Sequence, residues 1–307
     1  MKLNLGTFKV ADVVLGRGTS FAGGVLTIDE QEIQDLVTQD GNLAGVQVHI
    51  VKPGEPKRII HVLDVIEPRI KLDTGLDVFP GFLSAPVTAG RGTTYRLSGV
   101  TVVESAQLPW DAGGLLIPRE GIIDMVGPGR HYSPFHETIN VALCFELAEG
   151  KSDVEYDASV RMAGIKVSKY LANTVRHLTP DTTEVFSTEG RRSDIPNIVY
   201  IHQYQSQGTY AHTYCYGKHM YENLPTVINP NEMIDGALVS GNYAYACFKT
   251  PTYLHCNNPV MLELYKGHGI NHNFAGVIIA RGHNYTFDEK LRSAQYAAKL
   301  AKELDAQ

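Results

Sequence analysis

The chain has 307 residues, of which 43% are hydrophobic and 20% charged, and it carries a net charge of −6. This composition is typical of a soluble globular protein and excludes a disordered or fibrous chain. Acidic residues outnumber basic ones and no basic cluster is present, which argues against a groove for nucleic-acid phosphates. No apolar stretch approaches the roughly 18 residues that a membrane helix needs. Four cysteines without a C-x-x-C pair favour a reducing cytoplasm over a disulfide framework.

Residues 1–110 are expected to form a β-rich N-terminal domain. Short apolar runs, such as Val46–Val51 and Ile59–Ile66, alternate there with turn signals. One helix interrupts the strands, because Asp29 can cap a segment over Glu30–Gln39 whose apolar residues share one face.

Residues 111–307 are expected to form an α/β domain with a mainly parallel sheet. Ser152 and Glu155 have the spacing of a helix capping box, and two later runs are short and β-rich, of the kind buried in a parallel sheet. The expected elements are a helix from Ser152 to about His177, strands over Asn197–Gln203 and Phe274–Ala280, and an amphipathic helix over Glu289–Leu304. The fold class is therefore α/β, with a β-rich N-terminal region.

Histidines and cysteines gather in the second half of the chain. Zinc needs three or four convergent nitrogen or sulfur ligands, and no known ligand spacing is present, so no metal is assigned. His202, Cys215 and His219 are the residues to examine if a metal were bound. His212 and His255 are instead expected to act in proton transfer or to contact a substrate.

A polar turn at Ser240–Asn242 precedes Cys247, and two interpretations of this cysteine remain open. In one, Cys247 is a small apolar residue packed below the turn. In the other, strain in the Ala246–Cys247 peptide lets the thiol attack the preceding carbonyl, and elimination followed by hydrolysis leaves a pyruvoyl group. Asn242 and Ser240 would then orient that carbonyl, or they simply make the turn.

Several separated blocks of sequence follow one another along the chain. They are Leu116–Met125, Gly127–Gly129, Tyr132–Phe135, Asp235–Ala237, Ser240–Asn242, Ala246–Cys247 and Asn257–Pro259. In these blocks, and over nearly its whole length, the chain resembles the proprotein subunit of glycine/sarcosine/betaine reductase component B. The D-proline reductase proprotein is a more distant relative by the same comparison. Relative to that family, the chain is expected to be truncated at its C-terminus.

The resemblance implies a substrate-binding subunit that cleaves itself and turns Cys247 into a pyruvoyl cofactor. It implies a partner subunit with a reactive cysteine or selenocysteine, which displaces the amine from a small amine or amino acid. The carboxymethyl group would pass to a small selenoprotein, with reducing equivalents from thioredoxin, in a cytoplasmic hetero-oligomer. The expected site residues are Cys247, Asn242 and His255 for catalysis, and His212, Tyr214 and Asn257 for substrate binding.

Two other function classes stay open at this point. The fold could serve a metal- or thiol-dependent hydrolase or lyase of a small nitrogen compound, with a site lined by His202, His212, Cys215, Cys247 and His255. Alternatively, the chain could be a non-catalytic scaffold for a partner that holds all the chemistry. The residues name neither the amine nor the oligomeric state, and they leave a thiol and a selenol partner equally open.

Overall fold

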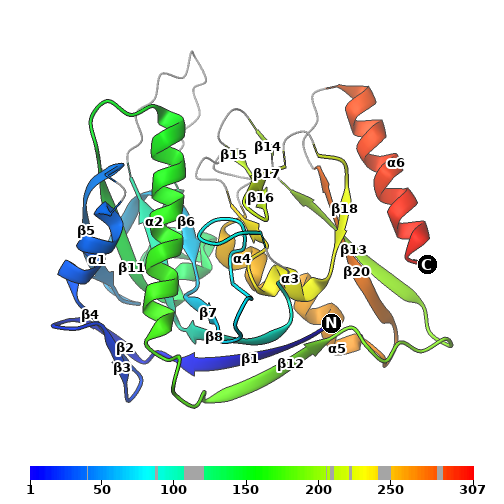
Figure 1. The fold of residues 1–307 in the computed structure, drawn as a ribbon, viewed down its shortest axis with the longest axis horizontal. Coiled ribbons are helices and arrows are strands. Elements are labelled where there is room, and N and C mark those ends of the chain that lie inside the picture. Colours follow the sequence, from blue (N-terminus) through cyan, green and yellow to red (C-terminus); the bar gives the residue numbers. More distant parts are fainter. Residues whose placement is uncertain are drawn as a thin grey trace.

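Figure 1 shows two groups of elements, one around helix α2 (Asp153–Asn173) and one around strand β20 (Asn273–Arg281), with strand β1 (Lys2–Lys9) running from beside the second group to the foot of α2. This computed structural model describes residues 1–39, 41–86, 89–106, 121–204, 206–207, 211–220, 223–240, 250–281 and 286–307. Within these ranges, no helix is long and apolar enough to cross a membrane.

The first group is built on a five-stranded sheet in the order β10-β6-β9-β11-β5. Its strands are β5 (Leu43–Val51), β6 (Arg58–Ile66), β9 (Val100–Ser105), β10 (Gly121–Asp124) and β11 (Ile139–Leu147). Helix α1 (Glu30–Thr38) and α2 pack on this sheet and bury a common apolar core. Both predicted caps are confirmed: the Asp29 side chain accepts from Gln31 N–H, and Ser152 and Glu155 form a capping box. Helix α2 ends at Asn173, four residues before the predicted end.

Two further sheets extend this group. The four-stranded sheet β12-β1-β8-β7 contains β1, β7 (Arg69–Lys71), β8 (Gly92–Ser98) and β12 (Thr182–Ser187). The three-stranded sheet β2-β4-β3 contains β2 (Asp12–Leu15), β3 (Ser20–Ala22) and β4 (Val25–Ile28). Because β1 pairs with both β8 and β12, the start of the chain joins residues from either side of α2.

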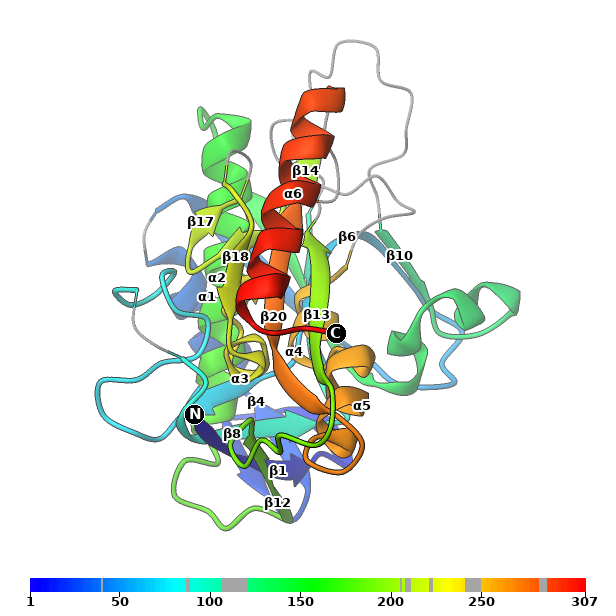
Figure 2. The ribbon, with the colours of Figure 1, turned by 90° about the vertical axis from the view of Figure 1, so that its right-hand side faces the viewer.

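The second group contains the two predicted apolar strands. Strand β13 (Asn197–Tyr204) lies parallel to β20, and the short β18 (Thr226–Ile228) is antiparallel to β20 on its other edge. Helix α6 (Phe287–Glu303) lies along this sheet, as Figure 2 shows, with Ala297 buried against it. The predicted C-terminal helix is therefore confirmed.

The remaining helices and strands of the described chain are short. The helical ones are α3 (Pro230–Ile234), α4 (Thr252–Cys256), α5 (Pro259–Gly267) and the 3₁₀ helices η1 (Pro128–Tyr132) and η2 (Pro134–Glu137). The short strands are β14 (Ser206–Gln207), β15 (Ala211–His212), β16 (Tyr214–Cys215), β17 (Lys218–His219) and β19 (Leu238–Val239).

The prediction of a mainly parallel sheet is wrong. Among the described strands most pairings are antiparallel, and the parallel pairs are β1–β8, β2–β4, β9–β11 and β13–β20. A continuous apolar run indicates burial on both faces of a strand, but it carries no information on the direction of the neighbouring strands. The division of the chain at residue 110 stays a prediction; β10 and β11, which follow it, pair with β5, β6 and β9, which precede it.

Candidate functional site

The predicted catalytic residues Cys247 and Asn242 lie outside the described residues, in the range 241–249. The structure describes the chain on both sides of this range. Strand β19 ends just before Ser240, and helix α4 begins at Thr252. The surroundings of these two ends therefore define the candidate site.

A buried hydrogen-bond chain ties the two ends together. Ser240 N–H donates to Thr252 Oγ1 at 2.9 Å, and the Thr252 hydroxyl donates to Asp64 Oδ2 at 2.5 Å. Thr252 N–H also donates to Asp64 Oδ1 at 2.9 Å. All three residues are buried, and Asp64 is fully enclosed. Because Asp64 lies on β6 of the five-stranded sheet, both ends of the range that carries Cys247 are fixed to a rigid element.

A buried ion pair joins Lys71 to Asp235, which lies five residues before Ser240 in the sequence. Asp235, which caps the C-terminal end of α3, is fully buried against the ammonium of Lys71. Asp235 also accepts from the Thr94 hydroxyl at 2.6 Å and from Gly90 N–H at 2.6 Å. A buried charge is tolerated when it is paired and its other lone pairs are used, and Asp235 meets both conditions.

A second charged cluster holds the far end of α4. Arg69 Nη2 donates to Glu67 Oε2 at 2.5 Å and to Asn257 Oδ1 at 2.7 Å, and Asn257 Nδ2 returns a bond of 3.3 Å to Glu67. Burial opposes the charge of Arg69, but Glu67 and the other groups around it, Asp235 among them, together outweigh burial, and the pKa of the guanidinium is raised. Asn257, predicted to bind substrate, thus supports the end of α4, and Arg96 bonds to the same amide oxygen at 3.1 Å.

The fold brings two predicted histidines together. His202 on β13 and His255 on α4 pack with their ring centroids 5.3 Å apart and their planes at 82°. Both are buried, with 6% and 1% of their surfaces exposed. Burial lowers the pKa of His202 to about 4, so this imidazole is neutral at physiological pH.

The depressed pKa of His202 predicts a pH-dependent stability. An unfolded histidine titrates near its ordinary value of 6.5, so between about pH 6.5 and pH 4 the unfolded chain binds a proton that the folded chain does not. We therefore expect the free energy of unfolding to lose about 3 kcal/mol from this residue as the pH falls across that window. Urea denaturation of the wild-type chain and of His202→Gln measures it: the gap between their unfolding free energies should narrow toward pH 4, and a constant gap would contradict the assignment.

Tyr214, another predicted substrate-binding residue, stacks under a buried arginine. The Arg161 guanidinium lies 4.0 Å from the centroid of the Tyr214 ring and pairs with Asp157 one helical turn away on α2. Burial raises the pKa of Tyr214, with Arg161 acting in the opposite direction, so the phenol stays protonated. His212 lies on β15, two residues earlier, and its side chain is outside the described part of the structure.

The three residues considered for a metal are not brought together. Within the described ranges, no three histidine, cysteine or acidic side chains gather in a group that could hold a metal ion. Cys215 faces a buried apolar cluster, where burial raises the pKa of its thiol to about 12, and His219 lies exposed on β17. This finding concerns the described residues and does not extend to residues 241–249.

The sequence did not single out several residues that shape the site. Asp64, Lys71, Thr252 and Arg161 are all buried beside it. One signal was available, since Asp64 interrupts the apolar run Ile59–Ile66 with a charge. A carboxylate within a buried strand needs a specific partner.

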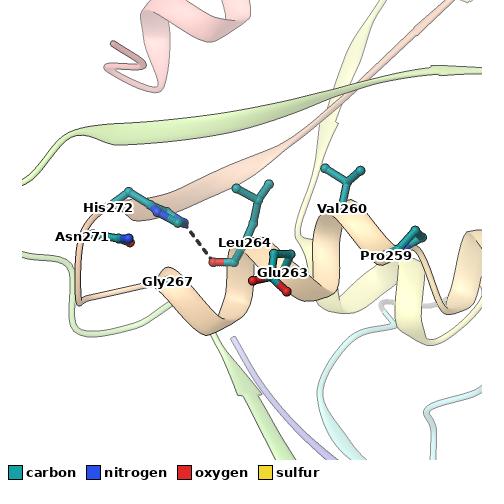
Figure 3. A pocket seen from close by; sticks show the side chains of 7 residues that line it. All are labelled: Pro259, Val260, Glu263, Leu264, Gly267, Asn271 and His272. Carbon is teal, nitrogen blue, oxygen red and sulfur yellow. Dashed lines mark hydrogen bonds between the residues drawn. The ribbon is translucent and has the colours of Figure 1, made fainter.

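A separate pocket lies along the outer side of α5, with a volume of about 620 Å³. Figure 3 shows Val260, Glu263 and Leu264 of α5 on one side, and His272 closing the end through a bond of 3.0 Å to the carbonyl oxygen of Leu264. None of the catalytic, substrate-binding or metal-binding residues predicted from the sequence lines this pocket.

Comparison with known proteins assigns the chain to a family. The family model for glycine/sarcosine/betaine reductase component B subunits matches residues 1–307. The chain belongs to this family. The resemblance found in the sequence blocks, and with it the expectation of a subunit of an enzyme, is confirmed.

Three curated relatives have similar identities. The glycine reductase complex component B subunits alpha and beta of Acetoanaerobium sticklandii are 39% identical to the chain, covering 99% of it and 70% of the relative. The sarcosine and betaine reductase complex component B subunits alpha of Peptoclostridium acidaminophilum are each 38% identical, covering 98% and 100% of the chain and 70% of each relative. No solved structure matches the chain.

Proposed function

We propose that this component B chain is the substrate-binding, self-cleaving subunit of a reductase complex that breaks the C–N bond of a small amino acid. The substrate class follows from the relatives, whose names specify glycine, sarcosine or betaine. The partner is a second subunit with a reactive cysteine or selenocysteine that attacks the carbon bearing the nitrogen. The glycine, sarcosine and betaine reductase relatives are 38–39% identical to the chain, so sequence identity does not select one of the three amines.

The observation that carries this proposal is the tether at both ends of the range 241–249. Self-cleavage needs the Cys247 thiol to be held against the carbonyl carbon of Ala246, and a segment fixed at Ser240 and Thr252 restricts the conformations between them. The name of the Acetoanaerobium sticklandii relative, which assigns subunits alpha and beta to one sequence, agrees with a chain that is cut in two.

The proposed cleavage needs water but no external oxidant. The Cys247 sulfur attacks the carbonyl of Ala246, and the peptide nitrogen leaves as a free amine, which gives a thioester. Loss of the Cα proton breaks the Cβ–S bond, leaving dehydroalanine at residue 247 and a thiocarboxylate on Ala246. The dehydroalanine tautomerises to an imine, and water releases ammonia to give the pyruvoyl group.

Substitution of Cys247 tests the proposal. We expect Cys247→Ala to remain one chain on a denaturing gel and to lose activity in the complete complex, because residue 247 then has no thiol to attack the carbonyl of Ala246 and no sulfur to eliminate. Cys144→Ala is the matched control, since Cys144 lies on β11 of the five-stranded sheet, and this variant should be cleaved like the wild type. Full activity of an uncleaved Cys247→Ala chain would contradict the proposal and favour the scaffold interpretation.

A further inference from the structure

Strand β13 has an open edge. Among the described strands its one neighbour is β20, so β13 forms an end of the three-stranded sheet β13-β20-β18. An edge strand presents a row of unpaired backbone N–H and C=O groups, and this row is a template for a further strand. Proteins usually cover or blunt such an edge unless another strand pairs with it. The surroundings of β13 therefore show whether a further strand fits.

The last residues of the chain occupy the first position along this edge. Ala306 forms a parallel bridge with Asn197, the first residue of β13, and Gln307 N–H donates to the carbonyl oxygen of Asn197 at 3.0 Å. Asn197 also pairs with Asn273 of β20, and a strand residue has one partner on each side. Ala306 thus lies at the open edge, and the backbone runs there in the direction of a new parallel strand.

The path from β20 through α6 to this edge has the usual handedness. Strands β20 and β13 are parallel, and α6 packs on one face of their sheet. In Figure 2, α6 lies in front of the sheet, β20 runs upward, and β13 lies to the right of β20. A strand beyond β13 completes a right-handed β-α-β connection with β20 and α6, and nearly all such connections are right-handed.

Helix α6 has two apolar faces. The first is centred on the buried Ala297 and packs on β20. The second, the exposed stripe of α6, has members separated by four, three and four residues, the spacing of one helix face: Phe287, Leu291, Ala294 and Ala298. Phe287 is 76% exposed. An exposed apolar face of this length is a feature of an interaction surface.

The exposed stripe of α6 lies on the side of β13. Viewed from its N-terminus, a right-handed helix turns clockwise by about 100° per residue, so the stripe lies about a quarter turn clockwise from Ala297. With the start of α6 at the top of Figure 2 and the sheet behind it, this direction points to the right, where β13 lies. Ile201 of β13 is on the same face, because it pairs with Ile278, which shares a buried cluster with Ala297. Ile201 is 44% exposed.

Helix α5 flanks the strand on the other face of the sheet. Asn258, the N-cap of α5, donates to the Tyr200 hydroxyl of β13 at 3.3 Å, and Leu264 packs in the buried cluster on that face. Figure 3 shows Val260 and Leu264, which line the pocket of about 620 Å³, pointing from α5 to the side on which the green ribbon of β13 passes. A strand beside β13 would therefore lie between α6 and α5, with alternate side chains directed to each.

We propose that the open edge of β13 is a docking site for a parallel β-strand of the polypeptide that corresponds to the final 30% of the relatives. The region that matches this chain is the N-terminal part of each relative and covers 70% of it. The docked strand follows the direction of Ala306, and its alternate residues are apolar because both helices present apolar side chains to it. A second copy of the chain fits less well, since copies related by a two-fold axis would pair their β13 edges antiparallel.

The probe for this site is the part of the Acetoanaerobium sticklandii relative that follows its matched region, made as a separate polypeptide. We expect it to bind the 307-residue chain, and the amide hydrogens of β13 to exchange about tenfold or more slowly in the complex. The same probe is also fused directly after Gln307, which removes the need for tight binding between sequences of two species. The amides of β13 should be protected in this fusion as well.

Two substitutions place a charge at the docking position. Ile201→Lys and Leu291→Lys alter exposed side chains, so the chain should still fold, and we expect each to weaken probe binding by about tenfold or more. Val185→Lys is the matched control, because Val185 is exposed on β12, the edge strand of a different sheet. This variant should bind the probe like the wild type in calorimetry.

Three results would overturn the proposal. The first is rapid exchange of the β13 amides in the fusion, equal to that in the free chain. The second is probe binding that Ile201→Lys and Leu291→Lys leave unchanged. The third is self-association of the chain without the probe, measured by sedimentation and abolished by Ile201→Lys, which would make a second copy the occupant. Because none of these measurements involves Cys247, they are independent of whether the proposed self-cleavage occurs.

Discussion

Lys71→Met is expected to lower the free energy of unfolding by about 3–5 kcal/mol, because it leaves the Asp235 carboxylate buried without its counter-ion. The Lys71 side chain is 1% exposed and that of Asp235 is fully enclosed. The methionine fills the volume of the lysine stem but offers no donor to Asp235, to Thr94 or to the carbonyl of Arg91. Urea denaturation followed by circular dichroism measures the loss.

The matched control is the same substitution in an exposed ion pair. Lys266 contacts Glu263 at 2.7 Å, and both side chains are more than 70% exposed, so Lys266→Met should change the stability far less. Equal losses in the two variants would show that the Lys71–Asp235 pair is no more important than a surface contact. Because Asp235 lies five residues before Ser240, we also expect Lys71→Met to slow self-cleavage.

Thr252→Val is expected to slow self-cleavage by about tenfold to a hundredfold. Valine keeps the shape of threonine but loses the hydroxyl that accepts from Ser240 N–H and donates to Asp64. A hydrogen bond to a charged group contributes about 1.5–3 kcal/mol, and about 1.4 kcal/mol corresponds to a factor of ten in rate. The rate is followed on denaturing gels after synthesis of the chain in a cell-free system.

Thr252→Ser separates positioning from stability. Serine restores the hydroxyl and omits one methyl group, so cleavage should return close to the wild-type rate even though a small cavity lowers the stability. Wild-type cleavage in Thr252→Val, with a reduced free energy of unfolding, would mean that the tether stabilises the fold without positioning Cys247.

Local signals in the sequence predicted the helices well. In the helix caps at Asp29 and Ser152, each side chain binds a backbone group within three residues of it. The sequence alone was therefore enough to predict both caps. Strands β13 and β20 were also visible as apolar runs, and they pair in parallel as expected. The sequence did not show that β18 would pair antiparallel to β20, because the direction of that pairing is decided by the path of the chain between the two strands.

The sequence suggests candidate site residues where the chemistry is contained in one residue, and it is silent where the surroundings of the site depend on tertiary contacts. A cysteine after a polar turn suggested a reaction on its own, and His255 was selected from the same region. Asp64 is 188 residues from Thr252, and the ring of His202 packs on that of His255, fifty-three residues further along the chain. Neither relation leaves a pattern of spacing or composition in a single sequence.

The most direct test of a component B subunit that cuts itself at Cys247 is the intact mass of the chain isolated from an active reductase complex. The account predicts two pieces, one ending at Ala246 and one beginning at residue 247 with a pyruvoyl group in place of the cysteine. A fully active complex that contains a single unbroken chain, with the sulfur of Cys247 still present, would contradict it.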